Sequence, residues 1–185
     1  MRHFIANQPL YRLFYALKPG SVTARQTDHF SHAMGTAAYR VQPDHLHMTL
    51  GVTADHLDYP YDLIKALLRA GTCVMGEPFD LLLDRLRISN RSAALCPSRS
   101  VPPLRRLQRQ IIEAMGRAGV PLRPGWSFNP HQTLFYRPAR PEQRRVEGFH
   151  WRVEEFVLIC SHVGQTRHDL LGTWPLTGGR QYELF

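Results

Sequence analysis

The chain has 185 residues, of which 43% are hydrophobic and 21% charged, a balance ordinary for a globular protein whose core needs no disulfide or metal to hold it together. The net charge is +8 and arginine supplies all but two of the 23 basic side chains, which favours an anionic partner such as RNA, although genomic base composition can produce the same bias. No apolar run approaches the roughly 20 residues of a membrane span, and the first residues lack the apolar segment of a secretory signal, so we expect a cytoplasmic protein with no membrane partner.

The first half of the chain predicts two strands and two helices. Residues 12–17 form a short apolar run that indicates a buried strand, and residues 21–34 are weakly helical. Residues 46–52 alternate in the manner of a strand. An apolar stripe at helical spacing predicts a helix over residues 61–70, which Gly71 would end.

The second half predicts more strands and the clearest helix of the chain. Two prolines at 102–103 open that helix and Gly119 ends it. Strands are predicted at residues 78–83, 92–96, 131–136, 156–163, 173–176 and 182–185, with a mobile linker at 138–143. Strands and helices are interspersed with several connections of hairpin length, so we expect an α+β fold with antiparallel sheets.

The cysteines Cys73, Cys96 and Cys160 are odd in number and have no Cys-x-x-Cys spacing. This pattern argues against both a disulfide framework and a zinc site. We expect three buried, reduced thiols.

One pattern of four residues occurs twice, as His47-Met48-Thr49-Leu50 and as His131-Gln132-Thr133-Leu134. Because the side-chain period of a strand is two, the histidine and the threonine of each copy share one face and the leucine lies on the other. Each copy therefore presents an imidazole beside a hydroxyl, while its leucine anchors the strand in the core. A single copy is most simply an ordinary strand segment; the repetition favours a functional site.

Two histidines and two threonines in one cleft would suffice to cleave a phosphodiester without a metal ion. A neutral imidazole can accept a proton from the attacking water, and a protonated imidazole can give one to the departing ribose oxygen. The hydroxyls of Thr49 and Thr133 can donate to the non-bridging phosphate oxygens. We expect His131 to activate the water and His47 to protonate the leaving oxygen, although the near symmetry of the two copies leaves the opposite assignment open.

The other histidines offer one alternative. His45 and His47 form a His-x-His pair that could bind a metal ion. No cluster of carboxylates and histidines accompanies this pair, so we expect a site without metal, with His45 at its rim. The remaining histidines share no spacing and are expected to be structural or exposed: His3, His29, His32, His56, His150, His162 and His168.

These segments resemble the two-histidine (2H) phosphoesterase superfamily, and within it the RNA 2′,3′-cyclic phosphodiesterases, also called 2′-5′ RNA ligases. The resemblance covers most of the chain. Residues 44–50 and 128–134 resemble the two His-x-Thr motifs of the family; its first, central and C-terminal strands resemble residues 12–19, 78–86, 156–161 and 174–176.

The resemblance implies one bilobal domain over residues 1–185, with two lobes related by a pseudo-twofold axis, antiparallel sheets flanking a central cleft, and helices outside. It implies a monomeric hydrolase that opens RNA 2′,3′-cyclic phosphate ends to 2′-phosphates without cofactor or metal, and whose reversal in vitro would give 2′-5′ ligation. Alternatives are a phosphodiesterase acting on another small cyclic phosphate or nucleotide, a non-catalytic RNA-binding module, and a metal-dependent hydrolase.

Two departures from the family pattern concern the substrate. Gly51-Val52-Thr53-Ala54 stands where the family often has Phe-Leu-Gly. The family often has an arginine five residues after the second histidine, where this chain has Tyr136, and Arg137 follows one residue later. Because a shift of one residue along a strand reverses the face, Arg137 is a candidate phosphate contact only if a bulge re-aims it.

Aromatic and basic residues near the second motif complete the candidates. Trp126, Phe128 and Tyr136 could stack on a nucleobase, although each could equally be a core residue. Arg123 and Arg167 are further candidate phosphate contacts. Arg105, Arg106 and Arg109 are expected to form a solvated helix face, with the holding of an RNA tail as the alternative.

Overall fold

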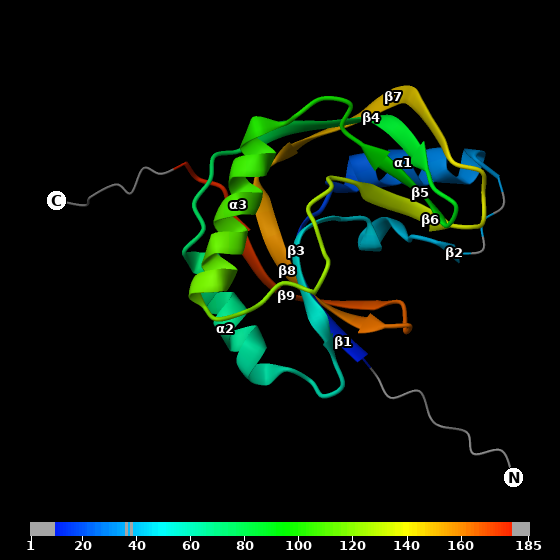
Figure 1. The fold of residues 1–185 in the computed structure, drawn as a ribbon. Helices are drawn as coiled ribbons and strands as arrows, with labels where there is room; N and C mark the ends of the chain where they lie inside the picture. Colours follow the sequence, from blue (N-terminus) through cyan, green and yellow to red (C-terminus); the bar gives the residue numbers. More distant parts are fainter. Residues whose placement is uncertain (1–9, 36, 38, 179–185) are drawn as a thin grey trace, which may run out of the picture.

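The computed structural model describes residues 10–35, 37 and 39–178, which form two antiparallel sheets with three α-helices against them (Figure 1). The elements in chain order are β1 (Leu10–Leu17), α1 (Ser21–Ala33), β2 (Tyr39–Arg40), the short 3₁₀ helix η1 (Pro43–His45), β3 (Met48–His56), α2 (Tyr61–Thr72), β4 (Phe79–Ile88), β5 (Ser92–Cys96), α3 (Pro102–Arg117), β6 (Gln132–Tyr136), β7 (Glu142–Val153), β8 (Glu155–Val163) and β9 (Arg167–Pro175).

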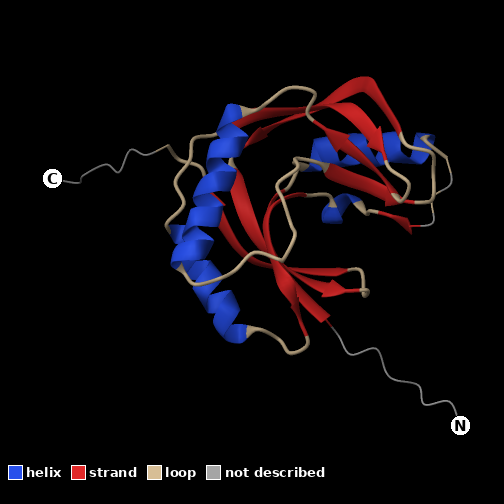
Figure 2. Cartoon of the chain, in the orientation of Figure 1, coloured by secondary structure: helices blue, strands red, loops and turns tan. Residues whose placement is uncertain are grey.

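The two sheets repeat one arrangement. The first has the strand order β3-β1-β8-β9 and the second β2-β6-β5-β4-β7, so β9-β8-β1-β3 matches β7-β4-β5-β6 strand for strand. The helices are exchanged: α1, which follows β1, packs on β6 and β7, whereas α3, which follows β5, packs on β3 (Figures 1 and 2). The predicted α+β fold of two pseudo-twofold lobes is confirmed.

The core explains why the repeated leucines matter. Leu50 in β3 and Leu134 in β6 are both fully buried, within one apolar cluster that spans both sheets. The amphipathic helix α3 covers this cluster with Leu104, Leu107 and Ile111 and turns its polar side outward. The leucines therefore fix both central strands to the same core, as the sequence predicts.

Strand β7 is not predicted by the sequence pattern. The predicted linker at 138–143 is wrong for its last two residues, 142 and 143. Glu142 pairs with Ile88 and Gln143 with Arg87, so these residues already belong to β7. The first seven residues of β7 leave almost every side chain exposed, because this strand lies at a sheet edge. Such a polar edge strand is held by backbone pairing to β4 and has no apolar alternation that could reveal it.

Two smaller expectations also differ from the structure. Cys96 and Cys160 are buried free thiols, whereas Cys73 is exposed because it caps the C-terminus of α2. The predicted strand at 182–185 lies outside the described residues. Among those described, no helix combines the length and apolar character required to cross a membrane.

Gly71 does not end α2, which continues to Thr72. A Cβ atom at this position would lie 2.4 to 2.7 Å from ring atoms of Trp174, so the glycine lets the indole pack directly on the helix backbone. Trp174 in turn stacks on Phe156 with ring centroids 5.2 Å apart. Packing, and not helix termination, accounts for this glycine.

We therefore predict that Gly71→Ala destabilises the protein by about 1–3 kcal/mol, because the added methyl overpacks the Trp174 contact. Elsewhere in a helix the same change is ordinarily stabilising by about 0.5–1 kcal/mol. Gly116→Ala in α3, where a Cβ atom would meet nothing within 4 Å, is the matched control and should be neutral or stabilising. Urea unfolding of both variants measures the difference; equal stabilities would contradict the packing role of Gly71.

Candidate active site

The four residues of the repeated motif line one cleft of about 690 Å³. Thr49 lies near the start of β3 in the first sheet and Thr133 near the start of β6 in the second, and His47 and His131 each immediately precede the strand. The structure thus brings the two predicted His-Thr pairs together from strands that occupy matching places in the two lobes.

A β-bulge follows each threonine. On β1, Ala16 pairs with Thr49 and the next residue, Tyr15, pairs with Gly51, so Leu50 is the extra residue. On β5, Ala94 pairs with Thr133 and the next residue, Ala93, pairs with Phe135, so Leu134 is the extra residue. The second lobe therefore repeats the register break of the first.

The bulge changes which later residue reaches the cleft. Simple alternation would place the residue two positions after each threonine on the cleft face. Instead the residue three positions after lines the cleft, which is Val52 in β3 and Tyr136 in β6. The position that often holds arginine in the family is therefore a cleft position here, occupied by Tyr136.

Arg137 does not line the cleft. Its guanidinium lies over the Phe135 ring, 5.2 Å from the centroid, and donates to the Met34 carbonyl at 3.5 Å. The bulge that could re-aim a side chain lies upstream and turns Tyr136 to the cleft, which leaves Arg137 beyond it. The predicted contact of Arg137 with a phosphate in the cleft therefore has no support in this geometry.

Both imidazoles are oriented in the same way. His47 Nδ1 lies 2.7 Å from the carbonyl oxygen of His45, and His131 Nδ1 lies 2.6 Å from that of Asn129. Because a carbonyl oxygen only accepts, each Nδ1 carries the proton and donates it, and each Nε2 is left for proton transfer. The backbone two residues earlier therefore sets the tautomer of both histidines.

The surroundings of His47 are apolar and crowded with other histidines. Its ring stacks on Phe14 with centroids 4.8 Å apart and meets the edge of His168 at 5.6 Å, while His168 stacks on His45 at 4.4 Å. Burial, aided by neighbouring histidines and Lys18, lowers the pKa of His47 to about 4, and similar causes lower the pKa of His168 to about 4. Both rings are neutral at neutral pH.

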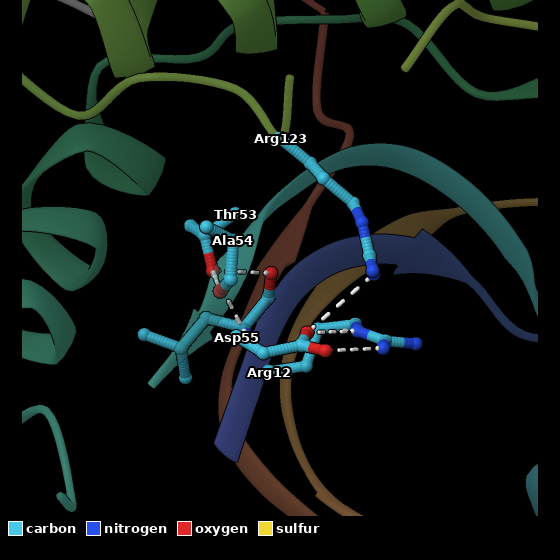
Figure 3. Close-up of polar contacts among 6 residues, drawn as sticks. Arg12, Thr53, Ala54, Asp55 and Arg123 are labelled. Atoms are coloured by element: carbon cyan, nitrogen blue, oxygen red, sulfur yellow. Dashed lines mark hydrogen bonds and ion pairs between the residues drawn. The ribbon is translucent and has the colours of Figure 1, made fainter. Parts of the chain in front are cut away.

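Two arginines that line the cleft share one carboxylate (Figure 3). Arg12 in β1 donates from Nε and Nη2 to Asp55 in β3 at 2.6 and 2.8 Å, a bidentate pair across neighbouring strands. Arg123 Nη1 approaches the same carboxylate at 3.4 Å. The bond from Arg12 holds the pKa of Asp55 below its ordinary value, so the carboxylate stays ionised and positions both guanidinium groups.

The predicted aromatic residues divide between two places. Trp126 and Tyr136 line the cleft, where Tyr39 joins Tyr136 with ring centroids 6.0 Å apart. Phe128 lies outside the cleft, in a separate hollow, and packs against the main core. The two cleft aromatics therefore remain candidates for stacking, and Phe128 does not contact a base in the cleft.

Several residues that line the cleft were not predicted as functional from the sequence, among them Arg12, Tyr39 and His168. Arg12 lies within the first strand and carried no motif; its partner Asp55 lies far along the chain and only the register of β1 and β3 joins them. His168 reaches the cleft from the β8–β9 hairpin, so its expected structural or exposed position is wrong. Arg123 and Arg167, the other candidate phosphate contacts, line the cleft, and Arg167 is bonded to Asp169.

The metal alternative finds no support in the part of the chain that the structure describes. No group of three or more histidine, cysteine, aspartate or glutamate side chains there is placed to hold a metal ion. His47 Nδ1 is already engaged by the backbone, and His45 stacks on another imidazole.

Comparison with known proteins gives the family and the fold. A family model described as the 2′-5′ RNA ligase superfamily matches residues 19–165. No curated protein matches the chain. Among solved structures, Escherichia coli LigT complexed with 3′-AMP superposes with a TM-score of 0.74 at 24% identity, covering 92% of this chain and 99% of that one. The protein TT0787 of Thermus thermophilus gives a TM-score of 0.72 at 22% identity, covering 91% and 100%.

The family match spans well over half of the chain and includes both His-x-Thr strands with the cleft between them. With the two-lobed fold that the solved structures share, it shows that this chain belongs to the 2′-5′ RNA ligase superfamily of two-histidine phosphoesterases.

Proposed function

We propose that the protein hydrolyses RNA ends that carry a 2′,3′-cyclic phosphate and leaves a 2′-phosphate, without a metal ion or cofactor. The observation that carries this proposal is the pair of imidazoles in one cleft, each with Nδ1 bound to the backbone and Nε2 left for proton transfer. A cyclic phosphodiester needs one base and one acid on opposite sides of the phosphorus, and a matched pair of histidines supplies both.

The reaction balances with the groups of the cleft. One Nε2 takes a proton from water as the water oxygen forms a bond to phosphorus. The bond from phosphorus to the ribose 3′ oxygen breaks, and the other histidine gives its Nε2 proton to that oxygen. Thr49 and Thr133 can donate to the non-bridging oxygens, and the guanidinium groups held by Asp55 add positive charge at the end of the cleft.

The sequence predicts water activation by His131 and protonation of the leaving oxygen by His47. The surroundings of the two histidines favour the opposite assignment. Burial against Phe14 keeps His47 neutral in the free enzyme, which suits a base. We therefore assign water activation to His47 and protonation of the 3′ oxygen to His131.

The substrate class rests on relatives and on charge. E. coli LigT has been solved with 3′-AMP and with phosphate, which are nucleotide and phosphate ligands of that protein. In this chain the cleft combines arginines with Trp126 and the Tyr39–Tyr136 pair, which suits a phosphate beside a nucleobase. Reversal of the reaction would give 2′-5′ ligation in vitro. We further propose that the protein is a monomer and acts in the cytoplasm.

We predict that His47→Ala and His131→Ala each lower the rate of cyclic-phosphate hydrolysis by about a hundredfold or more, because each removes one proton-transfer step. His29→Ala on the exposed side of α1 is the control and should retain full activity. The measurement is turnover of an RNA oligonucleotide ending in a 2′,3′-cyclic phosphate, with EDTA present throughout. Full activity in both alanine variants would exclude the two-histidine mechanism, and loss of wild-type activity in EDTA would revive the metal-dependent alternative.

The pH dependence of kcat/KM tests the assignment of roles, because this ratio reports ionisations in the free enzyme. With His47 as the base, and its pKa lowered to about 4, the rate should persist as the pH falls below 6.5 and decline only near pH 4 to 5. A decline centred at the ordinary histidine value of about 6.5 would contradict the lowered pKa of His47 on which this assignment rests.

The same lowered pKa values predict a loss of stability in acid. A histidine that is neutral in the fold takes up a proton on unfolding, so its contribution is present above the unfolded value of about 6.5 and is lost as the pH falls toward 4. The urea midpoint should therefore fall between pH 6.5 and 4, and His168→Asn should make that fall shallower than in the wild type. An unchanged slope would show that burial does not suppress the protonation of His168.

A further inference from the structure

Two hollows continue the cleft along α3. The first, of about 440 Å³, is lined by Trp126, Phe128, Arg105 and Arg109 among others, and it shares Trp126 with the cleft. The second, of about 260 Å³, is lined by Arg85, Arg87, Arg99 and Arg105, and it shares Arg105 with the first. We call this sequence of two hollows the α3 groove. Its residues from α3 lie between Val101 and Glu113, at the N-terminal cap and in the first three turns of the helix.

The α3 groove is lined by five arginines and one acidic side chain. In the described part of the chain none of its arginines forms an ion pair; Arg85 donates to the Ser98 carbonyl at 2.8 Å. The first turn of α3 has no acidic residue, and the one acidic side chain among the lining residues of the groove is Glu113. In the cleft, by contrast, Asp55 offsets Arg12 and Arg123.

Aromatic side chains lie beside these arginines in the hollow next to the cleft. Trp126 and Phe128 lie with ring centroids 6.4 Å apart and both are only half-buried, so each keeps a surface open to the first hollow. Arginines that follow a backbone, with aromatic faces on which successive bases stack, are the combination by which proteins hold single-stranded nucleic acid.

The groove is also joined to a catalytic histidine. In the amide orientation that satisfies both of its atoms, Asn129 accepts from Arg87 at 2.9 and 3.1 Å. The backbone carbonyl of the same residue accepts from His131 Nδ1. The turn that orients His131 in the cleft therefore also forms a wall of the second hollow.

We propose that the α3 groove binds the 5′ tail of a single-stranded RNA whose cyclic 3′ end lies in the cleft, so that the substrate class is an oligonucleotide and not a mononucleotide. This inference rests on the proposed function. Trp126 and Phe128 take the bases next to the scissile end, and the arginines from Arg105 to Arg85 take the backbone phosphates beyond them.

The test compares two substrates and two double variants of the full chain. The substrates are a mononucleotide 2′,3′-cyclic phosphate and a single-stranded RNA hexamer with the same end. The test variant is Arg105→Gln with Arg109→Gln. The control is Arg106→Gln with Arg117→Gln, which removes equal charge from the same helix at exposed positions that line neither the cleft nor the groove.

In the wild type, kcat/KM should be higher for the hexamer. In the test variant KM for the hexamer should rise by about tenfold with kcat retained, and the mononucleotide should be unaffected. The slope of log KM against log salt should become shallower by about 1.4, since each contact of an arginine with single-stranded RNA contributes about 0.7. The control variant should match the wild type.

Equal KM for the hexamer in the test and control variants, or no advantage of length in the wild type, would overturn the groove proposal. Direct binding of a hexamer ending in a 2′-phosphate, followed by fluorescence anisotropy, separates the two proposals. If the wild type hydrolyses neither substrate but binds the hexamer more tightly than the test variant does, the proposed function fails and the groove stands. Displacement of the hexamer by polyglutamate of equal charge as readily as by unlabelled RNA would overturn the assignment to RNA.

Discussion

The register break after each His-x-Thr segment is the constraint on which the site depends. In both central strands a fully buried leucine occupies the extra position, so the core itself holds the bulge in place. A regular strand would turn Val52 and Tyr136 away from the cleft and put Gly51 and Phe135 in their places. Because the same break occurs in both lobes, the pseudo-twofold axis delivers two imidazoles, two hydroxyls and two further side chains to one cavity.

The pseudo-twofold symmetry repeats the positions of the two histidines but not their surroundings, and the proposed division of roles rests on that difference. Phe14 pairs with Val52 in the first sheet, and Ser92 pairs with Tyr136 at the matching point of the second. His47 therefore stacks on the ring of Phe14, whereas β5 provides no aromatic ring at the matching point beside His131. The β8–β9 hairpin also places His168 against His47. A phenylalanine in place of a serine therefore gives the two imidazoles different surroundings in a site whose backbone geometry is repeated.

The sequence predicted what depends on local pattern and missed what depends on register. The period of two placed His47 and Thr49 on one face, and the repetition of the motif placed His131 and Thr133 beside them. The bulges could not be predicted, because they arise from the pairing with β1 and β5. For the same reason the sequence did not show that Tyr136 lines the cleft and that Arg137 does not. The Arg12–Asp55 pair and the polar edge strand β7 likewise exist only through contacts between distant segments.

The arginines of the catalytic cleft and those along α3 differ in whether a carboxylate pairs with them. Inside the cleft, Asp55 takes two bonds from Arg12 and approaches Arg123, which orients these groups but offsets much of their charge. Along α3 the arginines form no ion pair in the described chain, so their charge is available to a polyanion outside the catalytic cavity. A small cyclic phosphate touches only the offset charges, whereas a longer strand would also reach the unpaired ones. The proposed discrimination by length therefore rests on the pairing of Asp55 with the cleft arginines and on the arginines along α3, and the two histidines need take no part in it.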